Sequence, residues 1–282
     1  MQHLNLIVES LLDDEDEMAN DNTFIVKKFL DEHYRVIGKG NYRFKEEDGM
    51  IIVNLPKSTT IFTQHEVRRT MESLTNGLFR FGTTGDFNCG GCTNLKSLEG
   101  APRKCKMFIC DSCESLTSIK GAPLECDHFS CDGGTNLKSL EGAPQECGFF
   151  SCDWCTNLKS LEGLNKVNRA IHCAYCKHLS SLKGCPEKLS TFNGTNLTSL
   201  KTLEGGPKII EQRMDLAGSR IESLKGCPDI INGDFDISSC KHLKKLDYLP
   251  KKVGSIEVTT KYLDKGEIDR CEKLGYKIYD SI

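Results

Sequence analysis

The chain has 282 residues, a formal net charge of −3 and 16 cysteines. Its nearly balanced charge excludes the strongly basic surface that nucleic acids and anionic membranes require, so neither is an expected partner. The sequence also contains no apolar run of roughly 20 residues, the length that spans a bilayer. The length accommodates one repeat array with a small additional segment.

So many cysteines would ordinarily suggest the disulfide framework of a secreted domain. However, the start of the chain, Met1–Leu4, has neither the positive charge nor the following apolar region of a secretory signal. We therefore expect reduced thiols and a cytoplasmic location.

Residues 1–84 do not repeat, and we expect a small α+β segment that caps one end of the array. Apolar residues spaced three and four apart predict helices at Phe24–Tyr34 and Gln64–Leu74. Between them, Tyr42–Phe44 and Met50–Leu55 predict two strands joined by a short turn that contains glycine.

A sequence motif recurs along the middle of the chain. The segment Thr135–Pro144 is repeated almost unchanged at Thr93–Pro102, and in part at Thr156–Gly163. The last leucine or isoleucine of each copy lies 21 residues after the previous one, at Leu98, Ile119, Leu140, Leu161, Leu182, Leu203 and Leu224. A short and constant period of this kind predicts a solenoid.

Each copy also contains two apolar residues placed two apart, such as Phe150 and Cys152, and a third such as Cys155. Alternate residues of a strand lie on one side, so each copy predicts one short strand with an inward face. Parallel stacking joins these small faces into one core. The pattern predicts nine strands between Phe87 and Val258.

This pattern resembles leucine-rich repeats, with cysteine at the position that asparagine more often holds. The Leu-x-x-Leu-x-Gly-x-Pro return is similar to short bacterial and bacteriophage versions. The resemblance covers residues 85–259. It implies an α/β leucine-rich repeat solenoid with a parallel sheet of about nine short strands, a mostly non-helical convex side, a small α+β N-terminal segment and a C-terminal helical cap. It implies little about function, because such scaffolds bind many kinds of partner.

Residues 260–282 predict the cap at the other end of the array. Asp264 and Glu267 resemble a capping box, and the helix that follows is expected to end at Gly275. Tyr276–Tyr279 predicts a short closing strand.

The spacing of several cysteines matches that of zinc sites. Cys89-x-x-Cys92 is followed by Cys110-x-x-Cys113, which has the form of a four-cysteine site. The repeat favours another interpretation, because the column that contains Cys152 also contains Ile237, which cannot bind a metal. We therefore expect core thiols, with neither a metal nor a cofactor. A metal site or a disulfide between stacked cysteines stays open as an alternative.

The sequence does not predict an enzyme. His128 and His172 occupy outward strand positions, so they are expected to face away from the inward thiols. Bacterial repeat proteins that act as ubiquitin ligases carry a further catalytic domain, for which residues 260–282 are too few. An enzyme seated in the N-terminal segment is a minor alternative.

The outward residues of the strands predict the most informative surface, the concave strand face. We expect it to bind a partner through apolar anchors in an acidic field, because exposed apolar clusters rimmed by charge mark interaction sites. The candidate site residues are Met107, Ile109, Asp111, His128, Asp132, Phe149, Ser151, Asp153, Trp154, His172 and Tyr175. The alternative for the aspartates is that they recur with the repeat and are merely solvated.

The expected function is a non-enzymatic module that binds a protein on this face, and no small-molecule ligand is expected. The resemblance to bacteriophage repeats implies a phage protein that acts on a host factor in the host cytoplasm. The alternative is a structural or decoration component of a virion or other assembly.

Overall fold

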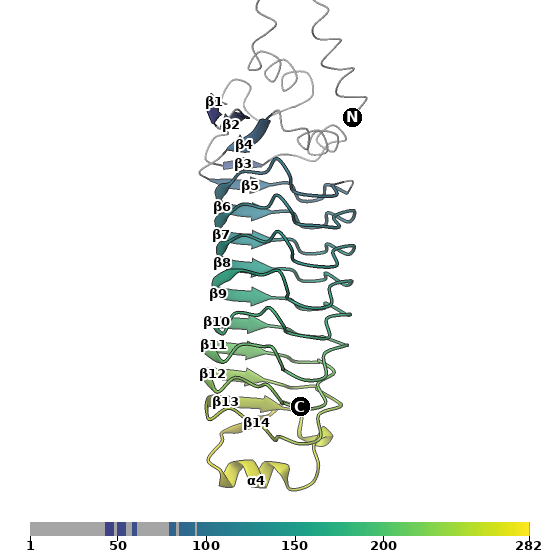
Figure 1. The fold of residues 1–282 in the computed structure, drawn as a ribbon. Coiled ribbons are helices and arrows are strands. Elements are labelled where there is room, and N and C mark those ends of the chain that lie inside the picture. Colours follow the sequence, from purple (N-terminus) through teal and green to yellow (C-terminus); the bar gives the residue numbers. More distant parts are fainter. Residues whose placement is uncertain are drawn as a thin grey trace, which may run out of the picture.

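The computed structural model describes residues 43–47, 50–54, 58–60, 79–82, 85–93 and 95–281. Figure 1 shows a stack of similar rungs, with the amino-terminal elements at one end and the carboxyl-terminal helix at the other. The two predicted helices, Phe24–Tyr34 and Gln64–Leu74, lie outside the described residues.

A small three-stranded sheet lies at the amino-terminal end. Strand β1 (Arg43–Glu47) pairs antiparallel with β2 (Met50–Asn54), and Glu47 lies opposite Met50. The predicted pair of strands is therefore confirmed as a hairpin. Strand β4 (Phe79–Gly82) adds to β2 in parallel and completes this sheet.

The main sheet has eleven strands in sequence order, and each pairs in parallel with the next. Its strands are β3 (Ser58–Thr60), β5 (Asp86–Asn88), β6 (Lys104–Ile109), β7 (Glu125–Ser130), β8 (Glu146–Ser151), β9 (Lys166–His172), β10 (Lys188–Asn193), β11 (Ile209–Asp215), β12 (Ile230–Asp236), β13 (Lys252–Val258) and β14 (Ile278–Asp280). The nine predicted strands are confirmed as β5–β13, and β3 and β14 add one strand at each end.

The core runs along the whole stack as columns of equivalent residues. Strand register places Phe87, Phe108, Phe129 and Phe150 above one another, and all four are fully buried. Their rings stack with centroids 5.2–5.5 Å apart. Stacked strands lie about 4.8 Å apart, so rings in register meet face to face. Burial of this shared apolar surface stabilises the stack, because no single rung encloses a core.

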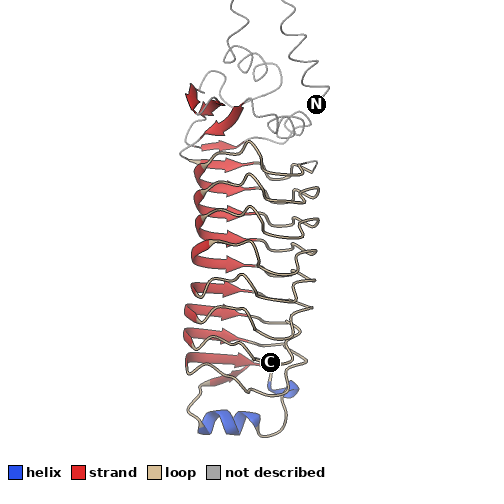
Figure 2. Cartoon of the chain, viewed as in Figure 1, coloured by secondary structure: helices blue, strands red, loops and turns tan. Residues whose placement is uncertain are grey.

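The chain returns from each strand through turns. In the β8 rung the N–H of Cys155 donates to the carbonyl of Cys152, and that of Leu158 donates to the carbonyl of Cys155. Figure 2 shows loops and turns on the side of the rungs away from the strands. Within the described rungs this confirms the predicted non-helical return, which the Gly-Ala-Pro stretches favour because proline lacks the donor that a helix interior requires.

The carboxyl-terminal end carries a short 3₁₀ turn, η1 (Thr260–Tyr262), and the helix α4 (Glu267–Lys273). The capping-box prediction was wrong: the N-cap is Gly266, and no side chain caps the helix. Glu267 accepts a 2.8 Å hydrogen bond from the backbone N–H of Leu246 instead, which ties the helix to the last rung.

The predicted end of α4 is confirmed at Gly275, whose φ is 89°. Its N–H donates to Glu272, and the N–H of Tyr276 donates to the carbonyl of Cys271. This pair of bonds is the Schellman arrangement, in which glycine adopts the left-handed conformation. In the described part of the chain, no helix is long and apolar enough to cross a bilayer.

Candidate functional site

We call the outward side of the long sheet the outer strand face. It corresponds to the concave strand face predicted from the sequence. Its members in the first half of the array alternate with core residues on β6–β9. Met107, Ile109, His128, Phe149 and His172 are half-buried on this face. Strand register sets Met107 beside His128 and Ile109 beside Ser130. Neighbouring rungs therefore join their outward side chains into one continuous surface.

The three aspartates at the carboxyl-terminal edge of this face form a ladder. Oδ1 of Asp132 accepts hydrogen bonds from the hydroxyl of Ser151 at 2.6 Å and from the backbone N–H of Asp153 at 2.8 Å. Asp111 makes the same two bonds one rung earlier, to Ser130 and Asp132. Asp153 accepts from the backbone N–H of Ala174 at 2.6 Å.

The ladder explains why aspartate recurs at this position: each carboxylate satisfies a backbone donor of the next rung where strand pairing ends. The aspartates are half-buried rather than merely solvated. Desolvation by burial raises the pKa of Asp132 and of Asp153, and neighbouring carboxylates raise both further. The edge of the face is therefore a strip of concentrated negative charge.

An aromatic row crosses the middle of the same face. The ring of Phe149 stacks on His128 with centroids 4.4 Å apart, and it meets His172 edge-on at 4.6 Å. Burial in this row lowers the pKa of His128 and of His172, because desolvation disfavours the imidazolium form. The two histidines are thus neutral ring partners at neutral pH.

A second aromatic pair lies where the β8 and β9 strands enter their turns. The rings of Trp154 and Tyr175 are nearly parallel, with an interplanar angle of 4° and centroids 4.1 Å apart. The two residues are 49% and 37% exposed, so this pair is the most exposed part of the predicted site.

The backbone of both residues is in a conformation that bulky side chains avoid. Trp154 has a φ of 61° and Tyr175 a φ of 59°. The equivalent positions of the other rungs are held by Gly91, Ser112, Gly133, Asn196, Gly218 and Ser239, which also have positive φ. Left-handed backbone costs about 1–3 kcal/mol for a residue other than glycine. The turn requires this conformation in each of these rungs, and in the β8 and β9 rungs the residues that adopt it carry exposed aromatic rings.

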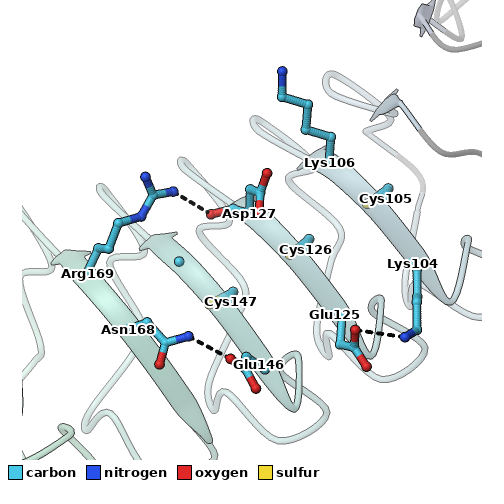
Figure 3. A pocket seen from close by; sticks show the side chains of 11 residues that line it. Lys104, Cys105, Lys106, Glu125, Cys126, Asp127, Glu146, Cys147, Asn168 and Arg169 are labelled. Carbon is cyan, nitrogen blue, oxygen red and sulfur yellow. Dashed lines mark hydrogen bonds and ion pairs between the residues drawn. The ribbon is translucent and has the colours of Figure 1, made fainter.

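A separate open groove of about 800 Å³ lies at the amino-terminal ends of strands β6–β9 (Figure 3). Its floor contains a column of three cysteines, and charged side chains form its walls. The lining residues are Lys104, Cys105, Lys106, Glu125, Cys126, Asp127, Glu146, Cys147, Gly148, Asn168 and Arg169.

One contact in this groove spans three rungs. Arg169 donates a 3.3 Å hydrogen bond to the carbonyl of Asp127, passing over Gly148. A Cβ atom at Gly148 would lie 2.6 Å from the Arg169 guanidinium, so only glycine leaves room for it. The register shift between β8 and β9 supplies the extra residue that places Arg169 there.

The groove is a weaker candidate than the outer strand face. Its walls pair with each other, since Lys104 contacts Glu125 at 2.8 Å and the side chain of Asn168 donates to Glu146 at 2.7 Å. Burial raises the pKa of Cys105 and of Cys147 to about 12, so the thiols of the floor are poor nucleophiles at neutral pH.

Comparisons with protein-family models, with curated proteins and with solved structures found no match. The candidate site therefore rests on the geometry of the described residues.

Most of the cysteines fill the core, including Cys126 and Cys147 of the groove. Cys110, Cys131, Cys152 and Cys173 are buried in one column, and each thiol donates to a carbonyl of the next rung at 3.2–3.6 Å. A second column donates to the preceding rung, as in the 3.3 Å bond from Cys155 to the carbonyl of Cys131. Ser219 makes the equivalent bond to Gly194 at 2.9 Å. Small donors suit this column because a carbonyl lies within reach.

Within the described residues, no group of three or more histidine, cysteine, aspartate or glutamate side chains is placed to hold a metal ion. The zinc-like spacing follows from the repeat, which puts the two cysteines of each C-x-x-C motif into different core columns.

The second half of the outer strand face is ionic rather than aromatic. Arg213 on β11 donates to Asp215 at 3.1 Å and to Asp236 on β12 at 2.8 Å. Both contacts are made by the same guanidinium nitrogen, Nη2. The structure thus brings the predicted residues together in three groups on the first half of the face: the aspartate ladder, the Phe149 row and the Trp154–Tyr175 pair.

Two features of this region were not predicted from the sequence. One is the Arg169 contact, which depends on a β-bulge that no residue pattern predicts. The other is the positive φ of Trp154, for which a signal existed: aligning the copies places Trp154 in a column with Gly91 and Gly133.

Proposed function

We propose that the protein is a non-enzymatic interaction module that binds a protein partner on the first half of the outer strand face. The observation that carries the proposal is the Trp154–Tyr175 pair, in which two exposed rings are stacked on backbone that disfavours bulky residues. Strain held in a folded protein marks functional positions, and tryptophan and tyrosine are favoured anchors of protein interfaces.

The surroundings of the pair support a protein as the partner. The Phe149 row adds apolar surface from the same two rungs and from the β7 rung, and the ladder supplies charge at its border. An apolar centre with a polar rim is the usual composition of a protein interface. The carboxylates disfavour nucleic acid, whose phosphates they would repel.

The proposal includes a cytoplasmic location. Most of the cysteines are buried and packed as thiols in the described rungs, and an oxidising compartment would favour cross-links between neighbouring rungs. Thiols that serve as core residues are compatible with a reducing environment.

The experiment compares partner capture by three forms of the full chain. These are the native protein, the double variant Trp154→Ala/Tyr175→Ala and the control Tyr248→Ala. Tyr248 is also exposed and also has positive φ, but it lies in a return segment. Captured proteins are quantified from cells in which the native protein acts.

We expect a protein that the native form and the control retain and that the double variant loses. The purified partner should then bind the double variant at least about tenfold more weakly. Equal capture by all three forms, with unchanged folding by circular dichroism, would contradict the proposal.

A further inference from the structure

The outer side of the Trp154 ring faces a rung position that has no side chain. Tyr175 of the β9 rung covers one side of the ring at 4.1 Å. The other side is directed toward the β7 rung, where the equivalent position is Gly133. Stacked strands lie about 4.8 Å apart, so a flat group at the level of Gly133 would lie against the free side of the indole ring.

A carboxylate stands beside this level. Asp132 precedes Gly133, and its Oδ1 lies 2.8 Å from the backbone nitrogen of Asp153, the residue before Trp154. Among the described residues, both hydrogen bonds of this carboxylate are to Oδ1. Oδ2 has no hydrogen-bond partner among the described residues, and the carboxylate is half-buried. Oδ2 of Asp132 is therefore an available acceptor for a ligand group that stacks on the Trp154 ring and carries a hydrogen-bond donor.

The charge of the outer strand face favours a ligand that carries positive charge. Between Met107 and Glu257 the outer strand face carries seven carboxylates, at Asp111, Asp132, Asp153, Asp215, Asp234, Asp236 and Glu257. Among these positions Arg213 is bonded to two of the carboxylates. Lys106 and Arg169 also lie on the outward side of the sheet, but in the groove at the amino-terminal ends of the strands, whereas the ladder lies at the carboxyl-terminal ends. Desolvation has raised the pKa of Asp132 and Asp153, and a bound cation would relieve their mutual repulsion.

We propose that the partner supplies a basic segment whose arginine stacks on Trp154 at the level of Gly133 and pairs with Asp132. The inference rests on the function proposed above and names the chemistry of its partner. A guanidinium fits because it is flat, stacks on aromatic faces and donates hydrogen bonds in its own plane. A lysine ammonium offers the charge without the flat surface, and an anionic or neutral ring gains nothing from the carboxylates.

The chain contains a direct reporter of this site, because Trp154 is its only tryptophan. The test titrates the full protein with capped pentapeptides that contain two arginines, two lysines, two citrullines or two glutamates, and follows tryptophan fluorescence. Citrulline keeps the flat shape of arginine but has no charge. We expect saturable quenching by the arginine peptide, with binding at least about fivefold weaker for lysine and for citrulline.

Three variants locate the site. Asp132→Asn keeps an acceptor for Ser151 and Asp153 but removes the charge, and should weaken arginine binding at least about fivefold. Gly133→Asn should weaken it similarly by filling the level beside the ring, and Asn196 shows that asparagine is accepted at this position. If the Gly133→Asn variant does not fold, Gly133→Ser replaces it in the test, because Ser112 occupies the equivalent position of the β6 rung.

The matched control is Asp234→Asn on the same face, since Asp234 also accepts a hydrogen bond from a serine of the next rung, Ser255, at 2.6 Å. It should leave arginine binding unchanged. Equal binding of the arginine and citrulline peptides would overturn the inference, as would full binding by the folded Asp132→Asn and Gly133→Asn variants.

The two proposals fail separately. If Trp154→Ala/Tyr175→Ala abolishes partner capture while the peptides show no preference for arginine, the interaction surface stands and its arginine chemistry is wrong. If partner capture survives the double variant, the proposed function is wrong whatever the peptides do.

Discussion

The two halves of the solenoid have the same strand arrangement but different residues in one column of the core. In the rungs of β6–β9 the second inward column is Cys110, Cys131, Cys152 and Cys173, whereas in the rungs of β10–β13 it is Gly194, Leu216, Ile237 and Val258. All eight residues are buried, and the parallel register continues through both halves. One scaffold therefore accepts thiol or aliphatic side chains at the same place, which indicates that the cysteines act in packing.

The outer strand face also differs between the halves, but there the difference changes the chemistry of the surface. Its first half presents stacked rings, and its second half presents the Arg213 ion pairs. Since the core of both halves meets the same requirements, the difference outside is not imposed by the fold. This contrast is the reason for proposing the partner site on the first half.

The largest expected effect comes from the column that both halves need. Phe150→Ala removes a fully buried ring that stacks on Phe129 at 5.2 Å. We expect the free energy of unfolding to fall by about 3–5 kcal/mol, because the cavity cannot collapse between fixed rungs. Urea denaturation followed by circular dichroism measures this. A loss below about 1 kcal/mol would mean that the ring column does not stabilise the stack.

The second effect is a pH dependence confined to the first half. The pKa values of His128 and His172 are lowered in the folded protein, so their contribution to stability is present above the unfolded value of about 6.5. It is lost as the pH falls through the lowered values, because the unfolded chain then binds more protons. The raised pKa values of Asp132 and Asp153 act in the opposite direction.

A comparison of variants separates these contributions. The native protein and His128→Gln/His172→Gln share the aspartates, so their difference reports the histidines. Between about pH 7.5 and pH 5 the melting temperature of the native protein should fall further than that of the variant. Parallel curves would show that the aromatic row does not disfavour imidazolium.

A smaller effect is expected when one filling is exchanged for the other. Cys152→Val gives a first-half rung the side chain that Val258 provides in the second half. We expect a loss of less than about 1.5 kcal/mol, as for other swaps that conserve volume. A loss of folding, or bound zinc that disappears with the substitution, would instead favour the metal site that the C-x-x-C spacing suggests.

The smallest effect is expected at the flanks, where both halves carry ion pairs between successive rungs. Glu162 pairs with Lys183, and Glu204 pairs with Lys225. All four side chains are exposed, and such pairs contribute little because water screens them. Glu162→Gln should leave the melting temperature unchanged within error, even at low salt. A clear destabilisation would show that these pairs help to set the register.

Much of the fold could be predicted because the repeat supplies many copies of the same evidence. The spacing of Phe150, Cys152 and Leu158 recurs in most rungs, so an error in one copy is corrected by the others. The capping box was wrong because it is a single local pattern. The carboxylate of Glu267 found a stronger partner in Leu246, which is near in space but distant in sequence.

The candidate site was predictable as a set of residues but not as an arrangement. Alternation along the strands placed His128, Phe149 and His172 on one face, and the structure stacks them in that order. The role of the aspartates depends on hydrogen bonds between rungs. The sequence shows only that aspartate recurs at one position of the repeat, and such recurrence is also expected of aspartates that are merely solvated. The reach of Arg169 over Gly148 depends on a register shift and is invisible in the sequence.

The serine–aspartate ladder joins each rung to the next through the same two bonds, wherever both partners recur. A cut that removes one whole repeat between equivalent positions would therefore bring matching donors and acceptors together again. The number of rungs can therefore change by duplication or deletion of a repeat unit. One extra residue is absorbed by a register shift, as where Phe192 pairs with Met214 at an offset of 22 residues. Length is thus an adjustable property of this molecule, and the spacing between its two ends can vary in steps of one strand without altering the proposed binding surface, provided that the rungs of β6–β9 are kept.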